Sequence, residues 1–408
     1  MTTIPGMKKS WKLHDRALQV IPMATQTHSK APREELRGIE PCFLVRGKGC
    51  RVWDLDGNEY IDFRNGLGPI TLGYCYPAVD DAIRQQIEDG IIFSYPHPLE
   101  VEVAERLVQV IPCAERVRFM KTGGEAMAAT QRLARAFTGR DLILTCGYHG
   151  WVNTISRSGV PETTKSTYRS LSWGDATPFA EAFQSAPDQI AGVSIACSYA
   201  DIEQGHTFLA DLRQLTELDG ALLIFDEIVT GFRLSLGGAQ EYFSVKPDLA
   251  VFAKGISNGV PLSCYVGRAD VMDTVEEVVI SSTFGGDTLG LAAAKSVLEI
   301  YEKEDVIKML WARGRQLHEG FNTHCNRLNL PVSFQGLPPL GQLVFNHPGR
   351  ERNRDLSLRF NEEVLKRGLI IFSVFYPSYS HSEADIAEAL KAMSEAIEVM
   401  RAEGLFDC

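Results

Sequence analysis

The 408-residue chain lacks the cysteine patterns of a disulfide framework and of a zinc site. Its nine cysteines are scattered, their number is odd, and no C-x-x-C pair occurs, so we expect no metal. Scattered cysteines are typical of proteins in a reducing compartment, which predicts a cytoplasmic location. The first twenty residues also lack the sustained apolar core of a secretory signal peptide.

The sequence lacks an excess of positive charge, and it lacks long apolar runs. Its net charge of −11 argues against nucleic acid or anionic membrane as the main partner, because both attract clustered lysine and arginine. Apolar runs such as GALLIF and GLIIFSVF are far shorter than the roughly 20 residues that cross a bilayer. The charge does not exclude a small-molecule anion, since a pocket can be locally positive.

Short apolar segments alternate with helical patterns through the middle of the chain. Helical stretches at 125–137 and 211–217 lie between expected strands. Such alternation predicts a mostly parallel sheet covered by helices, which is the α/β class. The expected strands are 117–120, 142–146, 193–197, 221–225, 249–253 and 264–267.

The two ends of the chain differ from the middle. A helix is expected over residues 12–20, and alternating residues on both sides of Asp56-Gly57 predict a hairpin. After about residue 305 the pattern is helix, short strands, helix, strand and a closing amphipathic helix. The chain is too long for one small core. We therefore predict a large domain over residues 75–305, and a small α+β domain built from residues 1–74 and 306–408.

Lys254 and Asp226 each follow an apolar strand. Both ends should face the crevice where α/β sheets bind ligands. Taken alone, Lys254 is a strand-end lysine that reaches water, and Asp226 is an acid that caps the next loop. A buried lysine can also form a Schiff base, and a buried carboxylate can hold a protonated ring nitrogen. Together they are the two protein groups that pyridoxal phosphate chemistry needs.

Three further motifs have weaker interpretations. The KTGGEA turn starts a helix, where the N–H groups of Gly123 and Gly124 could bind a phosphate. Tyr148 and His149 follow the next strand, where an aromatic ring could stack on a flat cofactor; ordinary loop packing is the alternative. Thr283, in a glycine-rich turn, could donate to a phosphate.

These motifs, in this order, resemble class III aminotransferases, which are pyridoxal phosphate enzymes of fold type I. The nearest resemblance is to the glutamate-1-semialdehyde 2,1-aminomutase branch. It covers nearly the whole chain. The matching stretches are GKGCRVWDLDGNEYIDF, the GGEA turn with RLARAFTGRD, CGYHG, ALLIFDEIVTGFR, FAKGISNGVPL, STFGGDTLGLAAA and SHSEADI.

The resemblance implies roles for residues around the cofactor ring. It implies that Lys254 is the Schiff-base lysine and that Asp226 pairs with the pyridine nitrogen. It further implies that Tyr148 stacks on one ring face and that Ile228 packs on the other. Lys254 and Asp226 are then the catalytic residues.

The resemblance also implies a shared active site. The backbone of Gly123 and Gly124 would hold the phosphate, and Thr283 would reach it from a second subunit. A homodimer is therefore expected. The chain departs from the family's usual residues at Gly124, where a hydroxyl residue is common, and at Asp287, where asparagine is usual.

Two other departures concern the substrate. Cys197 stands where many relatives carry glutamate, and Lys30 lies nearest to the place where aminomutases carry a carboxylate-binding arginine. We predict a pyridoxal phosphate-dependent aminotransferase that moves an amino group from an amine to a carbonyl acceptor. The alternatives are an intramolecular aminomutase of the glutamate-1-semialdehyde type, a lyase or racemase using the same cofactor, and a non-catalytic protein of this fold.

Overall fold

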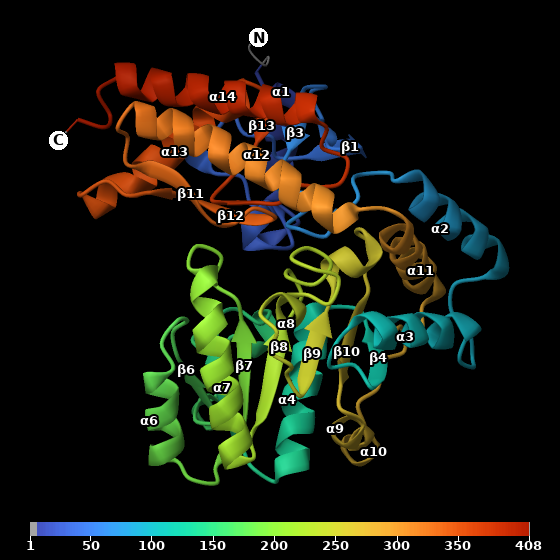
Figure 1. Cartoon of the computed structure of the whole chain (residues 1–408). Coiled ribbons are helices and arrows are strands. Elements are labelled where there is room, and N and C mark those ends of the chain that lie inside the picture. Colours follow the sequence, from blue (N-terminus) through green and yellow to red (C-terminus); the bar gives the residue numbers. More distant parts are fainter. Residues whose placement is uncertain (1–5, 408) are drawn as a thin grey trace. The chain divides into compact units, whose positions relative to one another are not determined.

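The computed structural model describes residues 6–407 (Figure 1). The chain divides into two compact units. One contains residues up to 76 together with those from 308 onward, and the other contains residues 77–307. No helix among the described residues is both long and apolar enough to cross a membrane.

The 77–307 unit is built on a seven-stranded sheet (Figure 1). The strand order is β4-β10-β9-β8-β7-β5-β6. The strands from β9 to β6 pair in parallel, whereas β10 is antiparallel to both of its neighbours. The mostly parallel α/β sheet expected from the sequence is therefore confirmed. The strands are β4 (Arg116–Met120), β5 (Leu142–Cys146), β6 (Tyr168–Ser170), β7 (Ile190–Ala196), β8 (Leu222–Asp226), β9 (Leu249–Phe252) and β10 (Ser263–Gly267).

Helices pack around this sheet, and local caps determine where α4 begins and ends. In α4, the Thr122 side chain and Glu125 form a capping box at the start, and Gly139 ends the helix with a left-handed φ of 67°. The helices are α2 (Pro77–Asp89), α3 (Pro98–Val110), α4 (Gly123–Thr138), α5 (Glu162–Lys165), α6 (Thr177–Ser185), α7 (Gly205–Asp219), α8 (Ala239–Tyr242), α9 (Ala269–Asp273), α10 (Val275–Val278) and α11 (Thr288–Lys303), with short 3₁₀ turns η4 (Trp151–Asn153), η5 (Ile202–Gln204) and η6 (Lys254–Ser257).

The other unit joins both ends of the chain in two small sheets. One has the order β1-β2-β3-β13, in which β13 from the C-terminal part pairs in parallel with β3; the other has the order β11-β12-β14. The hairpin expected at Asp56-Gly57 joins β2 to β3. The elements are α1 (Lys8–Ala17), η1 (Pro22–Ala24), η2 (His28–Lys30), η3 (Glu34–Leu36), β1 (Leu44–Lys48), β2 (Arg51–Asp54), β3 (Glu59–Asp62), α12 (Val306–Arg327), β11 (Val332–Leu337), β12 (Leu340–Phe345), α13 (Arg350–Lys366), β13 (Leu369–Ile370), β14 (Val374–Phe375) and α14 (Glu383–Ala402).

Several expected elements have different bounds in the structure. The first helix begins at Lys8 instead of residue 12, because the Asp56 carboxylate accepts hydrogen bonds from the backbone N–H groups of Lys9 and Ser10, both at 2.8 Å. This cap comes from the hairpin turn about 46 residues away, so the local pattern could not reveal it. The strand expected at 193–197 ends at Ala196. Cys197 consequently belongs to the loop that follows.

Candidate active site

The register of the parallel strands brings four strand ends to one edge of the sheet. Cys146 of β5 lies opposite Ile195, Ala196 of β7 lies opposite Asp226, and Asp226 of β8 lies opposite Val251 of β9. A cavity of about 630 Å³ lies at this edge, and all its lining residues belong to the 77–307 unit. Six residues predicted from the sequence line it, namely Gly123, Gly124, Tyr148, Asp226, Ile228 and Lys254.

Lys254 starts η6 directly after β9, and its backbone has a left-handed φ of 50°. A non-glycine residue in this region is uncommon and costs free energy of the order of 1–3 kcal/mol, so the surrounding packing must impose it. Burial lowers the pKa of Lys254 to about 8; the charge of Asp226 opposes this shift, and that of Arg233 adds to it. The neutral amine, which is the form that attacks a carbonyl carbon or accepts a proton, is consequently far more populated near neutral pH than in an exposed lysine.

Asp226 and His149 form a buried pair beside Lys254. The Nδ1 atom of His149 lies 2.8 Å from Oδ2 of Asp226, and both side chains are almost fully buried. The other carboxylate oxygen accepts the backbone N–H of Ile228 at 3.1 Å. Nδ2 of Asn153 donates to the His149 carbonyl at 2.7 Å, which fixes the loop that carries the imidazole. The pair presents an oriented negative charge at the end of β8.

The sequence alone assigns no role to His149. Its place next to Asp226 depends on the order β5-β7-β8, because the two residues follow strands that are separated by β7. The only sequence signal is that His149 follows the end of β5 within three residues, as Asp226 ends β8. The partner therefore becomes visible only when the strand order is known.

The glycine turn of α4 is closely packed against Ile228. A β-carbon placed on Gly123 would overlap the Ile228 side chain, meeting its Cδ1 atom and lying 2.8 Å from its Cγ1 atom. The corresponding position on Gly124 has no neighbour nearer than 3.6 Å, which is ordinary contact. Gly123 and Gly124 both line the cavity at the start of α4, and the backbone N–H groups of a helix N-terminus form an anion site.

Replacing Gly123 by alanine is expected to destabilise the cofactor-free protein by about 1–3 kcal/mol through overpacking against Ile228. Gly124→Ala is the matched control and should not lower the melting temperature, because its β-carbon has room. Thermal unfolding of both variants without cofactor measures the difference. Adding Ile228→Ala should recover most of the loss in Gly123→Ala. Equal melting temperatures for the two single variants would contradict the packing argument.

The structure also places three other residues that the sequence singled out, namely Thr283, Asp287 and Cys197. Thr283 does not line the cavity; it is exposed in the loop before α11. Asp287 caps α11 by accepting Leu289 N–H at 3.1 Å, and it pairs with Lys121 at the end of β4. Cys197 lines the cavity, and burial raises the pKa of its thiol well above the usual value, with Glu227 and Asp226 adding to the effect. A thiol of this kind is a poor nucleophile.

Comparison with known proteins identifies this arrangement. The profile of the family described as Aminotransferase class-III matches residues 34–397. The chain belongs to the class III aminotransferases. It is 31% identical to a 3-aminobutyryl-CoA aminotransferase of Cloacimonas acidaminovorans over 96% of this chain and 97% of that protein. It is 32% identical to a glutamate-1-semialdehyde 2,1-aminomutase of Aquifex aeolicus, over 95% and 99% of the two chains.

Two solved structures have the same fold. The FumI protein of Sphingopyxis sp. MTA144, in its PLP internal aldimine form, superposes with a TM-score of 0.90 at 26% identity, covering 97% of each chain. A transaminase with PLP bound superposes with a TM-score of 0.88 at 25% identity, covering 97% of this chain and 99% of the other. The protein is therefore an enzyme of fold type I that uses pyridoxal phosphate.

The residues of the cavity fit this cofactor. Gly123 and Gly124 line the cavity at the N-terminus of α4, where backbone N–H groups suit a phosphate. The Asp226–His149 pair provides a fixed negative charge for a protonated ring nitrogen. Lys254 provides an amine with a lowered pKa in the same cavity. All three requirements of the cofactor are met by one chain.

Proposed function

We propose that this enzyme transfers an amino group between an amine donor and a carbonyl acceptor, with Lys254 as the residue that binds the cofactor covalently and then moves the proton. The observation that carries the proposal is the amine of Lys254, with a pKa of about 8, in one cavity with the buried carboxylate of Asp226. Bound pyridoxal phosphate supplies an electron sink for the pair released when a Cα–H bond breaks.

Each residue of the site has a defined task in this proposal. Lys254, when its amine is neutral, accepts the proton from the substrate carbon that is bonded to the amino nitrogen of the substrate. It then returns the proton to the carbon on the other side of that substrate nitrogen. Asp226 holds the ring nitrogen by charge, and His149 orients the carboxylate through its Nδ1 atom. Tyr148 and Ile228 cover the two ring faces, and the N–H groups of Gly123 and Gly124 bind the phosphate.

Capture of the cofactor should depend on pH through Lys254. Only the neutral amine attacks the aldehyde, so the capture rate of cofactor-free enzyme is expected to rise about tenfold per pH unit below pH 8 and to level off above it. Stopped-flow absorbance between pH 6 and 9.5 measures the rate. A profile that keeps rising to pH 9.5 would show that the amine is not perturbed. Lys254→Ala is the control that should show no covalent capture.

We further propose a homodimer in which Thr283 binds the phosphate held by the partner subunit. In a single chain Thr283 is exposed and lies outside the cavity. Large exposed apolar side chains of the same unit support an interface, namely Ile91, Ile92, Phe93, Tyr95 and Phe284. Such exposure is unusual for a monomer and is typical of an interaction surface.

Mixing two inactive variants tests the shared site. Thr283→Asp should repel the phosphate without disturbing the fold, because the side chain is exposed, and Lys254→Ala removes the covalent lysine. Mixed dimers would place both changes in one site and leave the other intact. Unfolding, mixing and refolding should therefore restore about a quarter of wild-type activity under random pairing. No recovery, with mixed dimers shown by mass spectrometry, would contradict a shared site.

The aminomutase alternative is supported by the two curated relatives of that name, which are 32% and 33% identical to this chain. An aminomutase needs no external acceptor, whereas an aminotransferase does. The deciding experiment loads the enzyme as the pyridoxamine phosphate form and screens carbonyl compounds for recovery of the absorbance of the lysine-bound cofactor. Recovery with release of a free amine supports transfer. Conversion of one substrate with no added donor or acceptor would instead support the aminomutase.

A further inference from the structure

A largely buried ion pair lies next to the proposed phosphate turn. Lys121 directly follows β4 and precedes Thr122, the residue that caps α4, and Gly123. Its ammonium group forms a salt bridge with Asp287, the residue that caps α11. The two side chains are only 18% and 15% exposed. When one partner of such a pair is removed, the charge that remains is costly, because it has lost both its counter-charge and most of its water.

The Lys121 ammonium joins three segments of the 77–307 unit. Besides Asp287, it contacts the loop between η6 and β10, where it donates to the Pro261 carbonyl at 2.9 Å. The first turn of α11 packs closely on it, since a β-carbon on Gly290 would lie 3.3 Å from Nζ. The ammonium therefore connects the phosphate turn, the loop that follows Lys254 and the start of α11.

Asp287 ends the loop that carries Thr283. This loop passes close over β4, because a β-carbon on Gly285 would lie 2.8 Å from the Phe119 carbonyl oxygen. Its end is held by Asp287, which pairs with Lys121 and accepts the N–H of the first helical turn. Thr283 itself is exposed. The ion pair is thus the charged link between the phosphate turn and the loop that presents Thr283.

Two acids lie along this loop. Asp287 is at its end, and Glu100 packs against its middle, since a β-carbon on Gly286 would lie 2.7 Å from Oε1 of Glu100. A phosphate group carries about two negative charges, so an uncompensated carboxylate on the loop would repel it. Within residues 6–407, Lys121 is the one cation that forms a salt bridge with Asp287. The loop can approach a phosphate more easily when this charge is neutralised.

We propose that Lys121 is a positioning residue for the cofactor phosphate and that it acts through Asp287. The pair neutralises Asp287 and ties the Thr283 loop to the turn that binds the phosphate. This inference rests on the shared site proposed above, and it adds to that site a residue that does not line the cavity. Because the turn serves its own site and the loop serves the site of the partner subunit, the pair links the two phosphate sites of the dimer.

Binding of two forms of the cofactor to cofactor-free enzyme tests this role. Pyridoxal has the ring and the aldehyde of pyridoxal phosphate but lacks the phosphate. Lys121→Gln leaves Asp287 without its counter-charge and should weaken pyridoxal phosphate binding about tenfold. Pyridoxal binding should change by less than about twofold, because it has no group for the turn or the loop to hold. Absorbance titration of the lysine-bound forms measures both affinities.

A double variant tests whether Lys121 acts through Asp287. Lys121→Gln combined with Asp287→Asn removes both charges, and the asparagine keeps an oxygen that can cap α11. Replacing both members of a buried ion pair is often nearly neutral. The double variant should therefore bind pyridoxal phosphate within about threefold of wild type. A loss as large as that of Lys121→Gln alone would overturn the proposed path through Asp287.

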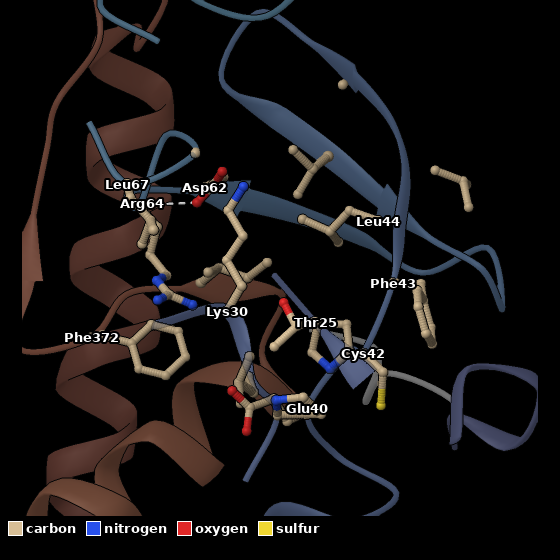
Figure 2. Close-up of a pocket in the computed structure, with 18 of the residues that line it drawn as sticks. Thr25, Lys30, Glu40, Cys42, Phe43, Leu44, Asp62, Arg64, Leu67 and Phe372 are labelled. Carbon is tan, nitrogen blue, oxygen red and sulfur yellow. Dashed lines mark hydrogen bonds between the residues drawn. The ribbon is translucent and has the colours of Figure 1, made fainter. Parts of the chain in front are cut away.

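The matched control breaks a comparable ion pair in the unit that joins the chain ends. Arg33 pairs with Glu40 at 3.1 Å, and the Glu40 side chain is 6% exposed. Glu40 lines a separate cavity of that unit (Figure 2), which shares no lining residue with the cofactor cavity. Arg33→Gln should lower the melting temperature, because it leaves a buried carboxylate unpaired. It should leave the affinity for pyridoxal phosphate unchanged.

Two results would overturn the role of Lys121. One is an affinity of Lys121→Gln for pyridoxal phosphate within about twofold of wild type. The other is an equal loss of affinity for pyridoxal, which would indicate general damage to the fold. Both are independent of amino-group transfer, because binding is measured without an amine substrate. They are also distinct from failure of the shared site, which the mixing of Thr283→Asp with Lys254→Ala detects in chains that keep Lys121.

Discussion

Lys254→Ala is expected to abolish amino-group transfer, with kcat lowered by at least about 10⁴-fold, because one residue supplies both covalent attachment and proton movement. The absorbance of the lysine-bound cofactor should disappear at the same time. Steady-state kinetics and absorbance of the purified variant measure both effects. Lys246→Ala, at an exposed lysine before β9, is the matched control and should keep wild-type activity. Measurable turnover above about one per cent of wild type would exclude Lys254 as the base.

Stability separates a functional role of Lys254 from a structural one. The folded-state pKa of about 8 lies below the ordinary 10.5, so the unfolded chain binds the proton more tightly. The protonated lysine then costs the cofactor-free fold on the order of 3 kcal/mol below pH 8. This cost decreases as pH rises from 8 to 10.5 and is absent above that range.

Lys254→Met, which keeps the side-chain volume, should therefore be more stable than the cofactor-free wild type at pH 7. The advantage should shrink at pH 9.5. Thermal or urea unfolding at the two pH values measures it. A lysine that stabilised the fold through contacts would show the reverse, with the variant less stable at both pH values. The wild type thus retains an unfavourable amine at the position that the chemistry needs.

The sequence predicted the parts of this fold that depend on local patterns. The run LILTC was expected as a strand and forms β5, and the Asp56-Gly57 hairpin was expected and is present. Both follow from β-branched and apolar alternation and from a turn dipeptide. The start of α1 was missed, since its cap is the distant Asp56 carboxylate.

The candidate site was predictable where it depends on strand ends, and not where it depends on strand order. Lys254 and Asp226 could be selected because each follows an apolar strand at the edge where α/β sheets bind ligands. The bond between His149 and Asp226 could not be, since β7 lies between their strands and only the sheet order brings them together.

Asp226→Asn is expected to lower kcat by about 10²–10³-fold, which is the usual cost of losing one well-placed charge or donor at a reacting group. Affinity for the cofactor should fall as well, because the ring nitrogen loses its counter-charge. Kinetics with each half-reaction and titration of cofactor-free protein measure the two effects. The His149→Gln variant should have a smaller effect, about tenfold, since the carboxylate would still be present but less well oriented.

Asp226→Asn also separates the two interpretations of Asp226, which are a partner of the cofactor ring nitrogen and a cap of the next loop. An asparagine keeps an oxygen that can accept a hydrogen bond from the Ile228 N–H or from the His149 ring nitrogen. A loop-capping role therefore survives in Asp226→Asn. The negative charge does not survive. A variant that folds with an unchanged melting temperature but loses activity therefore assigns the charge to the cofactor ring. Activity within about threefold of wild type would instead make Asp226 a cap. The double variant with His149→Gln should lose little more than Asp226→Asn alone, because both changes act through the same carboxylate.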